Sequence, residues 1–287
     1  MLALAETHNV TMRFGPVTAV DSVNLKVGGG EVVGLLGANG AGKTTVIRLL
    51  LGLVRASRGE VALFGAPPSM RTRRRIGYVP QALGLYDDLT VEENWTFTAS
   101  AFHATRRALP PSISDARDQL VGTLPLGLQR RVAFAMAFSH QPELLVLDEP
   151  TSGVGALNRA RLWQDIRDSA EHDTGVLVTT HNMEEAEQCD RLVVMAGGRV
   201  VAEGTVAEVI GDRQVVEARC DSWQKAFSVL DAEGLIVQVQ GEILRVPASP
   251  QHVKEVLTRN HLRADVATVP ANLEEAFVSI VSGGAVR

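Results

Sequence analysis

The sequence has few of the features that mark secreted, membrane-spanning or nucleic-acid-binding proteins. Its 287 residues include two cysteines, Cys189 and Cys220, whose spacing fits no metal site, so a reducing compartment is expected. No apolar run approaches the roughly 18 residues that cross a bilayer. The N-terminus lacks a basic segment followed by a long apolar stretch, so no signal peptide is expected. If the protein works at a membrane, another chain must supply the span.

Charge gives equally little support for a nucleic-acid partner. The formal net charge is −5, which provides no general attraction to nucleic acid or to anionic lipid. The one basic run, Arg71–Arg75, has no interleaved aromatic residues and is expected to be a solvated loop or helix face. We therefore expect no nucleic-acid partner. Apolar residues at 45% and charged residues at 21% indicate an ordinary globular protein.

The segment Gly37–Thr44 matches the pattern G-x-x-x-x-G-K-[ST] without a gap. An apolar run, Val32–Leu36, precedes it, and a helix-compatible run follows from Thr45, which is the context of a phosphate-binding loop. Glycines let the backbone N–H groups curl toward phosphate oxygens, and the helix start adds the positive end of its dipole. We expect Lys43 to reach the β- and γ-phosphates and the Thr44 hydroxyl to bind Mg²⁺. The alternative is a glycine-rich turn that binds nothing, which the complete motif disfavours.

Polar residues follow three further apolar runs that are expected to be strands. Leu144–Leu147 is followed by Asp148 and Glu149, His181 follows the run that begins at Val176, and Gln81 follows Ile76–Val79. Parallel sheets place their ligands at the carboxyl ends of strands. Asp148 is therefore expected at a Mg²⁺ site, and Glu149 is expected to polarise an attacking water. His181 is a candidate γ-phosphate contact, and Gln81 a candidate contact to Mg²⁺ and water.

The chain divides into two predicted domains. Residues 1–211 combine short antiparallel strands, a helical segment at about 82–140 and strands alternating with helices, which indicates a parallel sheet. The pattern restarts near Gly211. Residues 212–287 follow the order βαββαβ with a final helix, typical of a small ferredoxin-like α+β domain, which we interpret as a regulatory or dimer-supporting appendage.

The ordered motifs resemble those of the ATP-binding cassette (ABC) superfamily over about residues 4–210. In detail the chain is most similar to the ATPases of ABC-2-type exporters, the group that contains daunorubicin-resistance-like drug pumps. The segments that carry this finer resemblance are Leu83–Asn94, Thr179–Glu187 and Asn272–Phe277. The resemblance implies a P-loop NTPase cassette with an antiparallel β subdomain, a parallel-sheet core and a short helical subdomain. It also implies an ATPase that couples hydrolysis to transport, with ATP and Mg²⁺ as ligands.

The family resemblance also assigns residues to roles. Glu149, His181 and Lys43 would be catalytic, and Thr44, Gln81 and Asp148 would serve Mg²⁺. Phe14 would stack on adenine, where the alternative is a strand residue of the core. Gly127 and Gln129, in a signature-like segment at Leu124–Gln129, would contact the nucleotide held by a second subunit. The nucleotide-binding set is Phe14, Gly37, Asn39, Gly40, Ala41, Gly42, Lys43, Thr44, Thr45, Gly127 and Gln129.

Three features depart from the family pattern. The family signature, usually Leu-Ser-Gly-Gly, is here Leu-Pro-Leu-Gly, and Pro125 removes a hydroxyl and an N–H at a helix start that would bind the opposite γ-phosphate. This form resembles one subset of ABC-2-type ATPases. The D-loop-like segment Thr151–Gly155 ends in glycine where the family usually has aspartate. The stretch from Gln81 to Leu124 is short, which reduces or alters the surface for a membrane partner.

The sequence therefore predicts the ATPase subunit of an ABC-2-type exporter on the cytoplasmic side of the cell membrane. It would be attached through a separate permease and would pair with a second ABC ATPase subunit, either the same chain or a paralogue. One alternative is a weakly hydrolysing partner in an asymmetric heterodimer, because the signature and D-loop differ from the family pattern while the P-loop and Glu149 match it. A soluble ABC protein without a transport role is disfavoured, since the chain has one cassette and no long coiled coil. The sequence does not identify the cargo.

Overall fold

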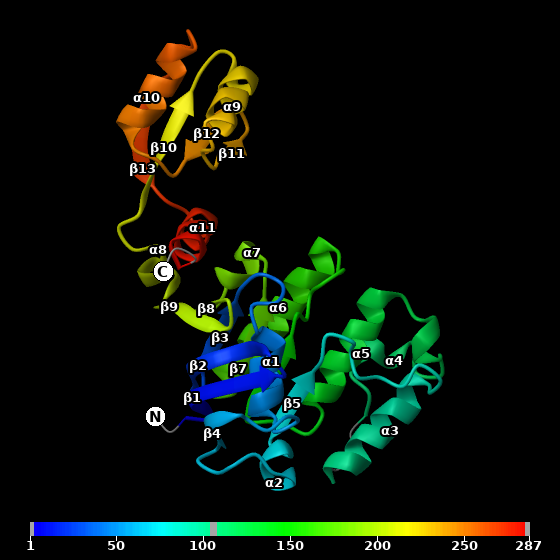
Figure 1. Cartoon of the computed structure of the whole chain (residues 1–287). Helices are drawn as coiled ribbons and strands as arrows, with labels where there is room; N and C mark the ends of the chain where they lie inside the picture. The colour runs from blue at the N-terminus through cyan, green and yellow to red at the C-terminus, as the bar shows by residue number, and fades with distance from the viewer. Residues whose placement is uncertain (1–2, 104–107, 285–287) are drawn as a thin grey trace. The chain divides into compact units, whose positions relative to one another are not determined.

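The computed structural model describes residues 3–103 and 108–284. It consists of two compact units, Met1–Val206 and Ala207–Arg287, which are described separately (Figure 1). The division precedes the expected boundary at Gly211 by a few residues and coincides with the start of helix α8 (Val206–Ile210). Separate folding of residues 212–287 stays a prediction.

The first unit contains a three-stranded antiparallel sheet in the order β2-β1-β4. Its strands are β1 (Ala5–Phe14), β2 (Val17–Val27) and β4 (Arg58–Leu63). The sequence predicts short strands in this part of the chain, but residues 17–27 form one strand of 11 residues. Register shifts and the left-handed backbone of Ser22, with φ of 55°, absorb the irregular alternation of the sequence.

A six-stranded sheet in the order β5-β6-β7-β3-β8-β9 forms the centre of the same unit. Its strands are parallel except β9, which pairs antiparallel with β8 in a hairpin. Every residue of β3, β6 and β7 is buried, which explains why these strands are continuous apolar runs. The strand bounds are β3 (Val32–Leu36), β5 (Ile76–Val79), β6 (Leu144–Asp148), β7 (Gly175–Thr180), β8 (Arg191–Ala196) and β9 (Arg199–Gly204).

Helices connect these strands and build the helical segment. The connecting helices are α1 (Lys43–Leu50), α2 (Met70–Arg73), α6 (Ala156–Glu171) and α7 (Met183–Ala186). The helical segment comprises α3 (Val91–Phe102), α4 (Pro111–Ser114), a 3₁₀ turn (Val121–Thr123) and α5 (Leu126–Phe138) around a small apolar core that includes Trp95 and Val132. Helix α5 packs directly on β5, because a side chain at Gly77 would collide with the Ala137 carbonyl oxygen.

The second unit has the expected ferredoxin-like arrangement, with strand order β11-β12-β10-β13. Apolar residues of β10, β12, α9 and α10, including Val216, Leu230, Leu244 and Val253, form its own core. The bounds are β10 (Gln214–Arg219), α9 (Trp223–Ala232), β11 (Gln238–Gln240), β12 (Ile243–Val246), α10 (Pro250–Arg259), β13 (Asp265–Pro270) and α11 (Leu273–Gly284).

Two helices of the second unit begin at residues whose side chains cap the helix N-terminus. The Ser249 hydroxyl accepts the His252 N–H at 3.2 Å, and Pro250 occupies the first turn of α10. At α11, Asn272 and Glu275 cap each other reciprocally, with both bonds at 2.8 Å. Arg245 on β12 donates to Glu275 at 2.6 Å and so fixes the start of α11 to the sheet.

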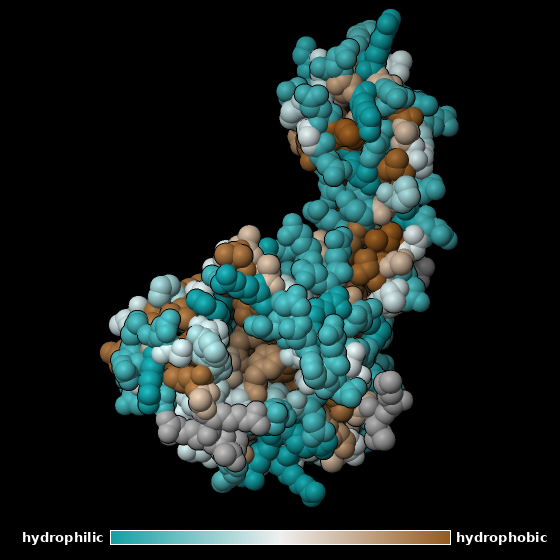
Figure 2. Space-filling model, turned by 180° about the vertical axis from the view of Figure 1, so that it is seen from behind, coloured by the Kyte–Doolittle hydropathy of each residue, from teal (hydrophilic) through white to brown (hydrophobic). Residues whose placement is uncertain are grey.

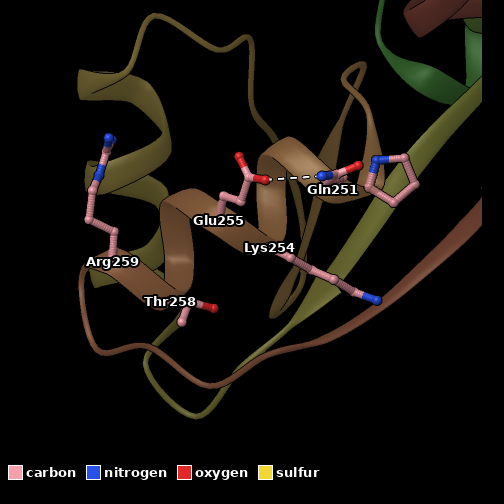
Figure 3. Close-up of a pocket in the computed structure, with 6 residues that line it drawn as sticks. Gln251, Lys254, Glu255, Thr258 and Arg259 are labelled. Carbon is pink, nitrogen blue, oxygen red and sulfur yellow. Dashed lines mark hydrogen bonds between the residues drawn. The ribbon is translucent and has the colours of Figure 1, made fainter.

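A shallow depression of about 600 Å³ lies on α10 (Figure 3). Gln251 donates to Glu255 at 3.2 Å, a bond between neighbours one helical turn apart. The side chains of Lys254 and Arg259 point in different directions, so the polar groups do not converge on one point. This depression therefore has the character of a solvated helix face.

Candidate functional site

The loop between β3 and α1 closes tightly on neighbouring backbone. A Cβ atom at Gly37 would lie 2.6 Å from the Met195 carbonyl oxygen, and one at Gly42 would lie 2.6 Å from the Ala19 carbonyl oxygen. Gly42 also has a φ of 103°, which side-chain-bearing residues rarely adopt. Glycine is thus required at both positions, while Asn39 and Gly40 are exposed at the tip of the loop. Ala41 is buried beneath that tip.

Lys43 begins α1, and its side chain is held inside the loop. The ammonium group donates to the Gly37 carbonyl at 2.6 Å and to the Ala38 carbonyl at 3.1 Å. The residue is 5% exposed, and this burial lowers the pKa of the ammonium, while Glu149 and Asp148 act in the opposite direction. The loop therefore holds the buried Lys43 ammonium against two of its own backbone carbonyls.

Thr44 and Asp148 come together as the motifs predict. The Thr44 hydroxyl donates to Asp148 Oδ1 at 3.3 Å across the gap between α1 and the end of β6. Thr179, on the neighbouring strand β7, donates to the same oxygen at 2.7 Å and orients the carboxylate. A hydroxyl and a carboxylate are hard oxygen donors of the kind that Mg²⁺ takes, so this pair fits the expected metal. Thr45, the next residue of α1, is half-buried.

Glu149 is the point at which three other predicted residues meet. Its Oε1 lies 3.4 Å from His181 Nδ1 and 3.9 Å from Lys43 Nζ. Its Oε2 accepts from Gln81 Nε2 at 3.4 Å. The contacts come from the carboxyl ends of β5, β6 and β7 and from the start of α1, so the sheet edge gathers them as the strand order requires.

Three other residues predicted to contact a nucleotide, Phe14, Gly127 and Gln129, have different neighbours. Phe14 ends β1 with 47% of its surface exposed, so its ring is available for stacking, and its role stays a prediction. Gln129 donates to the Leu124 carbonyl at 2.9 Å. Gly127 lies against Asn158 of α6, which a Cβ atom would approach to 2.8 Å. The contact of Gly127 and Gln129 with a nucleotide on a second subunit also stays a prediction.

Two residues that the sequence did not single out support the cluster. Thr179 accepts the Glu149 N–H at 2.9 Å in addition to its bond with Asp148. Glu185, 4% exposed on α7, accepts from the Thr180 hydroxyl at 2.7 Å and from the Thr151 hydroxyl. Thr179 could have been predicted, because its hydroxyl ends the strand next to the one that carries Asp148 and Glu149. Nothing local indicated that Glu185 is buried.

Comparison with known proteins gives consistent matches. A family model described as ABC transporter matches residues 20–152. The chain is 40% identical over 295 residues to "Nod factor export ATP-binding protein I" of Burkholderia orbicola, with 97% of each chain covered. It is 38% identical over 212 residues to "Probable multidrug ABC transporter ATP-binding protein YbhF" of Escherichia coli, which covers 70% of this chain and only 37% of that protein.

Solved structures agree on the fold. "Structure of ATP binding subunit of ABC transporter" aligns with a TM-score of 0.68 at 29% identity and covers 72% of this chain and 91% of that chain. "Dimeric Structure of MJ0796, a Bacterial ABC Transporter Cassette" aligns with a TM-score of 0.62 at 24% identity, over 70% of this chain and 98% of that chain. The second likeness supports the fold alone.

Proposed function

The chain belongs to the ABC transporter family as one of its ATPases, and from this premise we propose that it powers an ABC-2-type exporter. In this proposal it binds and hydrolyses ATP, pairs with a second ABC ATPase subunit and drives a separate membrane permease. It would lie at the cytoplasmic face of the cell membrane. Relatives named as export ATP-binding proteins support the direction of transport. No described helix is long and apolar enough to cross a membrane.

The observation that carries the catalytic proposal is the convergence on Glu149. Lys43 would bind the β- and γ-phosphates, exchanging its two loop carbonyls for charged oxygens. Glu149 would accept a hydrogen bond from the attacking water and so polarise it, while His181 contacts the γ-phosphate. Thr44, Asp148 and Gln81 would hold Mg²⁺, which when bound supplies neutralising charge at the phosphates.

An apolar groove of the first unit supports the proposal of a permease partner. Its volume is about 280 Å³, and Arg73 and Arg74 are among the residues that line it. Figure 2 shows apolar surface in a hollow of this unit. We propose that it receives a short permease helix with apolar side chains and an acidic residue, because two guanidinium groups complement a carboxylate. The apolar lining residues are Leu51, Leu53, Met70, Ile76, Tyr78, Ala101 and Phe102.

A specific observation favours a variant of this function, the weakly hydrolysing partner of an asymmetric heterodimer. Pro125 is the N-cap of α5 and makes no side-chain capping bond, and Leu126 is 44% exposed at the helix start. Gly155 offers no carboxylate at the start of α6. These are the surfaces that the chain would present to its partner's nucleotide. ATPase assays on the chain alone and with candidate partner ATPases separate the two forms.

The substitution Glu149→Gln tests the central proposal. The amide keeps the shape of the side chain but cannot polarise water as a carboxylate does, so ATP binding should persist and turnover should nearly vanish. Glu143→Gln is a matched control, because Glu143 pairs with Arg75 at 2.6 Å on the exposed surface. Wild-type turnover in Glu149→Gln would refute the catalytic assignment, and loss of turnover in Glu143→Gln would show that the assay responds to general damage.

A further inference from the structure

The backbone at Glu149 is in an unusual conformation. Its φ is 49°, in the left-handed region that few residues other than glycine adopt. Such a conformation costs free energy and persists only where the surroundings hold it. The Glu149 N–H is held by the Thr179 hydroxyl at 2.9 Å on one side. The other side of the same residue, its carbonyl oxygen, is held by a different element.

Arg130 of α5 supplies that second contact. Its Nη1 donates to the Glu149 carbonyl at 3.2 Å and to the Pro150 carbonyl at 2.7 Å. Arg130 is 5% exposed, and burial lowers the pKa of its guanidinium, against the opposing effect of Glu149 and Glu185. Its Nε is buried without a hydrogen-bond partner among the described residues. Burying a cation for two backbone carbonyls is costly, which indicates that these bonds serve a purpose beyond packing.

We propose that Arg130 is a positioning residue for Glu149. This inference rests on the proposed function, in which Glu149 polarises the attacking water. By fixing the carbonyls of residues 149 and 150, Arg130 holds the left-handed turn that directs the Glu149 side chain toward Gln81 and His181. Without these bonds the backbone relaxes toward ordinary φ values and the carboxylate leaves its place.

The position of Arg130 on α5 gives the contact a second consequence. The same helix begins at Leu126, within the signature-like segment, four residues before Arg130. A displacement of α5 therefore changes the hydrogen bonds on the Glu149 carbonyl directly. The turn that carries Glu149 also contacts α7, because the Thr151 hydroxyl, two residues after Glu149, donates to Glu185. The turn that carries Glu149 is thus held between the helix of the signature and the helix that follows His181.

The test compares Arg130→Met, Arg130→Lys and the neighbouring Arg131→Met in steady-state ATPase assays. Misplacement of a reacting group by about 1 Å can cost on the order of 100-fold in rate, so we expect kcat of Arg130→Met to fall by about 10- to 100-fold. The KM for ATP should stay within about twofold, because Lys43 and its loop are untouched. Arg130→Lys should recover part of kcat, since an ammonium can donate to both carbonyls. Arg131 donates at 3.5 Å to Ser112 instead, so Arg131→Met should keep wild-type kcat.

A double-mutant cycle separates positioning from general stability. If Arg130 acts through Glu149, adding Arg130→Met to Glu149→Gln should lower the residual turnover no further. Equal proportional losses in both backgrounds would overturn the proposal, as would unchanged kcat in a folded Arg130→Met. Should Arg130→Met fail to fold, Arg130→Lys decides by its own kcat in the two backgrounds. If Glu149→Gln itself turns over normally, the catalytic assignment fails and not this contact alone.

Discussion

Restoring the usual signature residues at the start of α5 is the most demanding test of the dimer proposal. The N-cap is Pro125, with φ −57° and ψ 143°, a conformation that serine also adopts. Leu128 and Gln129 both donate to the Pro125 carbonyl, which leaves the N–H groups of Leu126 and Gly127 at the helix start. Pro125→Ser with Leu126→Gly would add a hydroxyl and space for a phosphate beside those groups.

The effect on the isolated chain should be small. A serine cap contributes about 1 kcal/mol, and loss of the proline's restriction of the unfolded chain removes about 0.4–1 kcal/mol. Replacing Leu126 by glycine in a helix costs up to about 0.8 kcal/mol. The free energy of unfolding should therefore fall by at most about 1 kcal/mol, which leaves an ordinary domain folded.

The effect on the ATP-bound dimer should be larger. A hydrogen bond to a charged phosphate is worth about 1.5–3 kcal/mol, and every 1.4 kcal/mol corresponds to a factor of ten in affinity. Two sites per symmetric dimer should tighten dimerisation by about 100-fold or more. Light scattering against protein concentration with ATP, in the Glu149→Gln background where ATP is not consumed, measures this constant. An unchanged or weaker dimer from a stably folded double variant would refute the weakened signature and show that Leu-Pro-Leu-Gly is already adapted.

Three further results are expected. Lys43→Ala should weaken nucleotide binding by about 2–3 kcal/mol through loss of a charge-assisted contact, and an unchanged direct titration would contradict its placement. Gly155→Asp should fit without strain, because no atom lies within 4 Å of its Cβ position, and should raise the unfolding free energy by a few tenths of a kcal/mol as an N-cap of α6, measured by urea denaturation. A chain ending at Gly211 should still bind ATP but dimerise or couple less well, whereas a folded truncation that binds no ATP would argue against a separable C-terminal domain.

Much of the candidate site, as a cluster of side chains, could be predicted because its signals are local. The loop at residues 37–44 carries its chemistry in one continuous motif, and Asp148, Glu149 and His181 each follow an apolar strand. Once those strands are parallel neighbours, their polar ends must meet. The ferredoxin-like order of the C-terminal unit followed from the same alternation of strands and helices.

The supporting contacts could not be predicted because they depend on which backbone groups face one another. Arginine and glutamate are usually solvent-exposed in helices, so nothing in the sequence marks Arg130 and Glu185 as buried. The packing of α5 and α7 on the sheet buries them. The left-handed turn at Glu149 likewise has no sequence signal, since glutamate has no preference for that region. The length of β2, 11 residues where short strands were expected, was not predicted because bulges disguise its alternation.

The connection between β5 and β6 has a consequence for how such chains diversify. These strands are adjacent and parallel, with Ile76 opposite Leu144, so a crossover of about a dozen residues would join them. Residues 80–143 are several times longer, and each doubling of a loop costs only about 0.6 kcal/mol in closure entropy. Insertions and deletions at exposed positions of this segment, away from buried residues such as Ile113 and Val121, should therefore change the outer surface at little thermodynamic cost. A lineage can reshape this segment while the sheet beneath keeps its parallel strands and the polar residues at their ends.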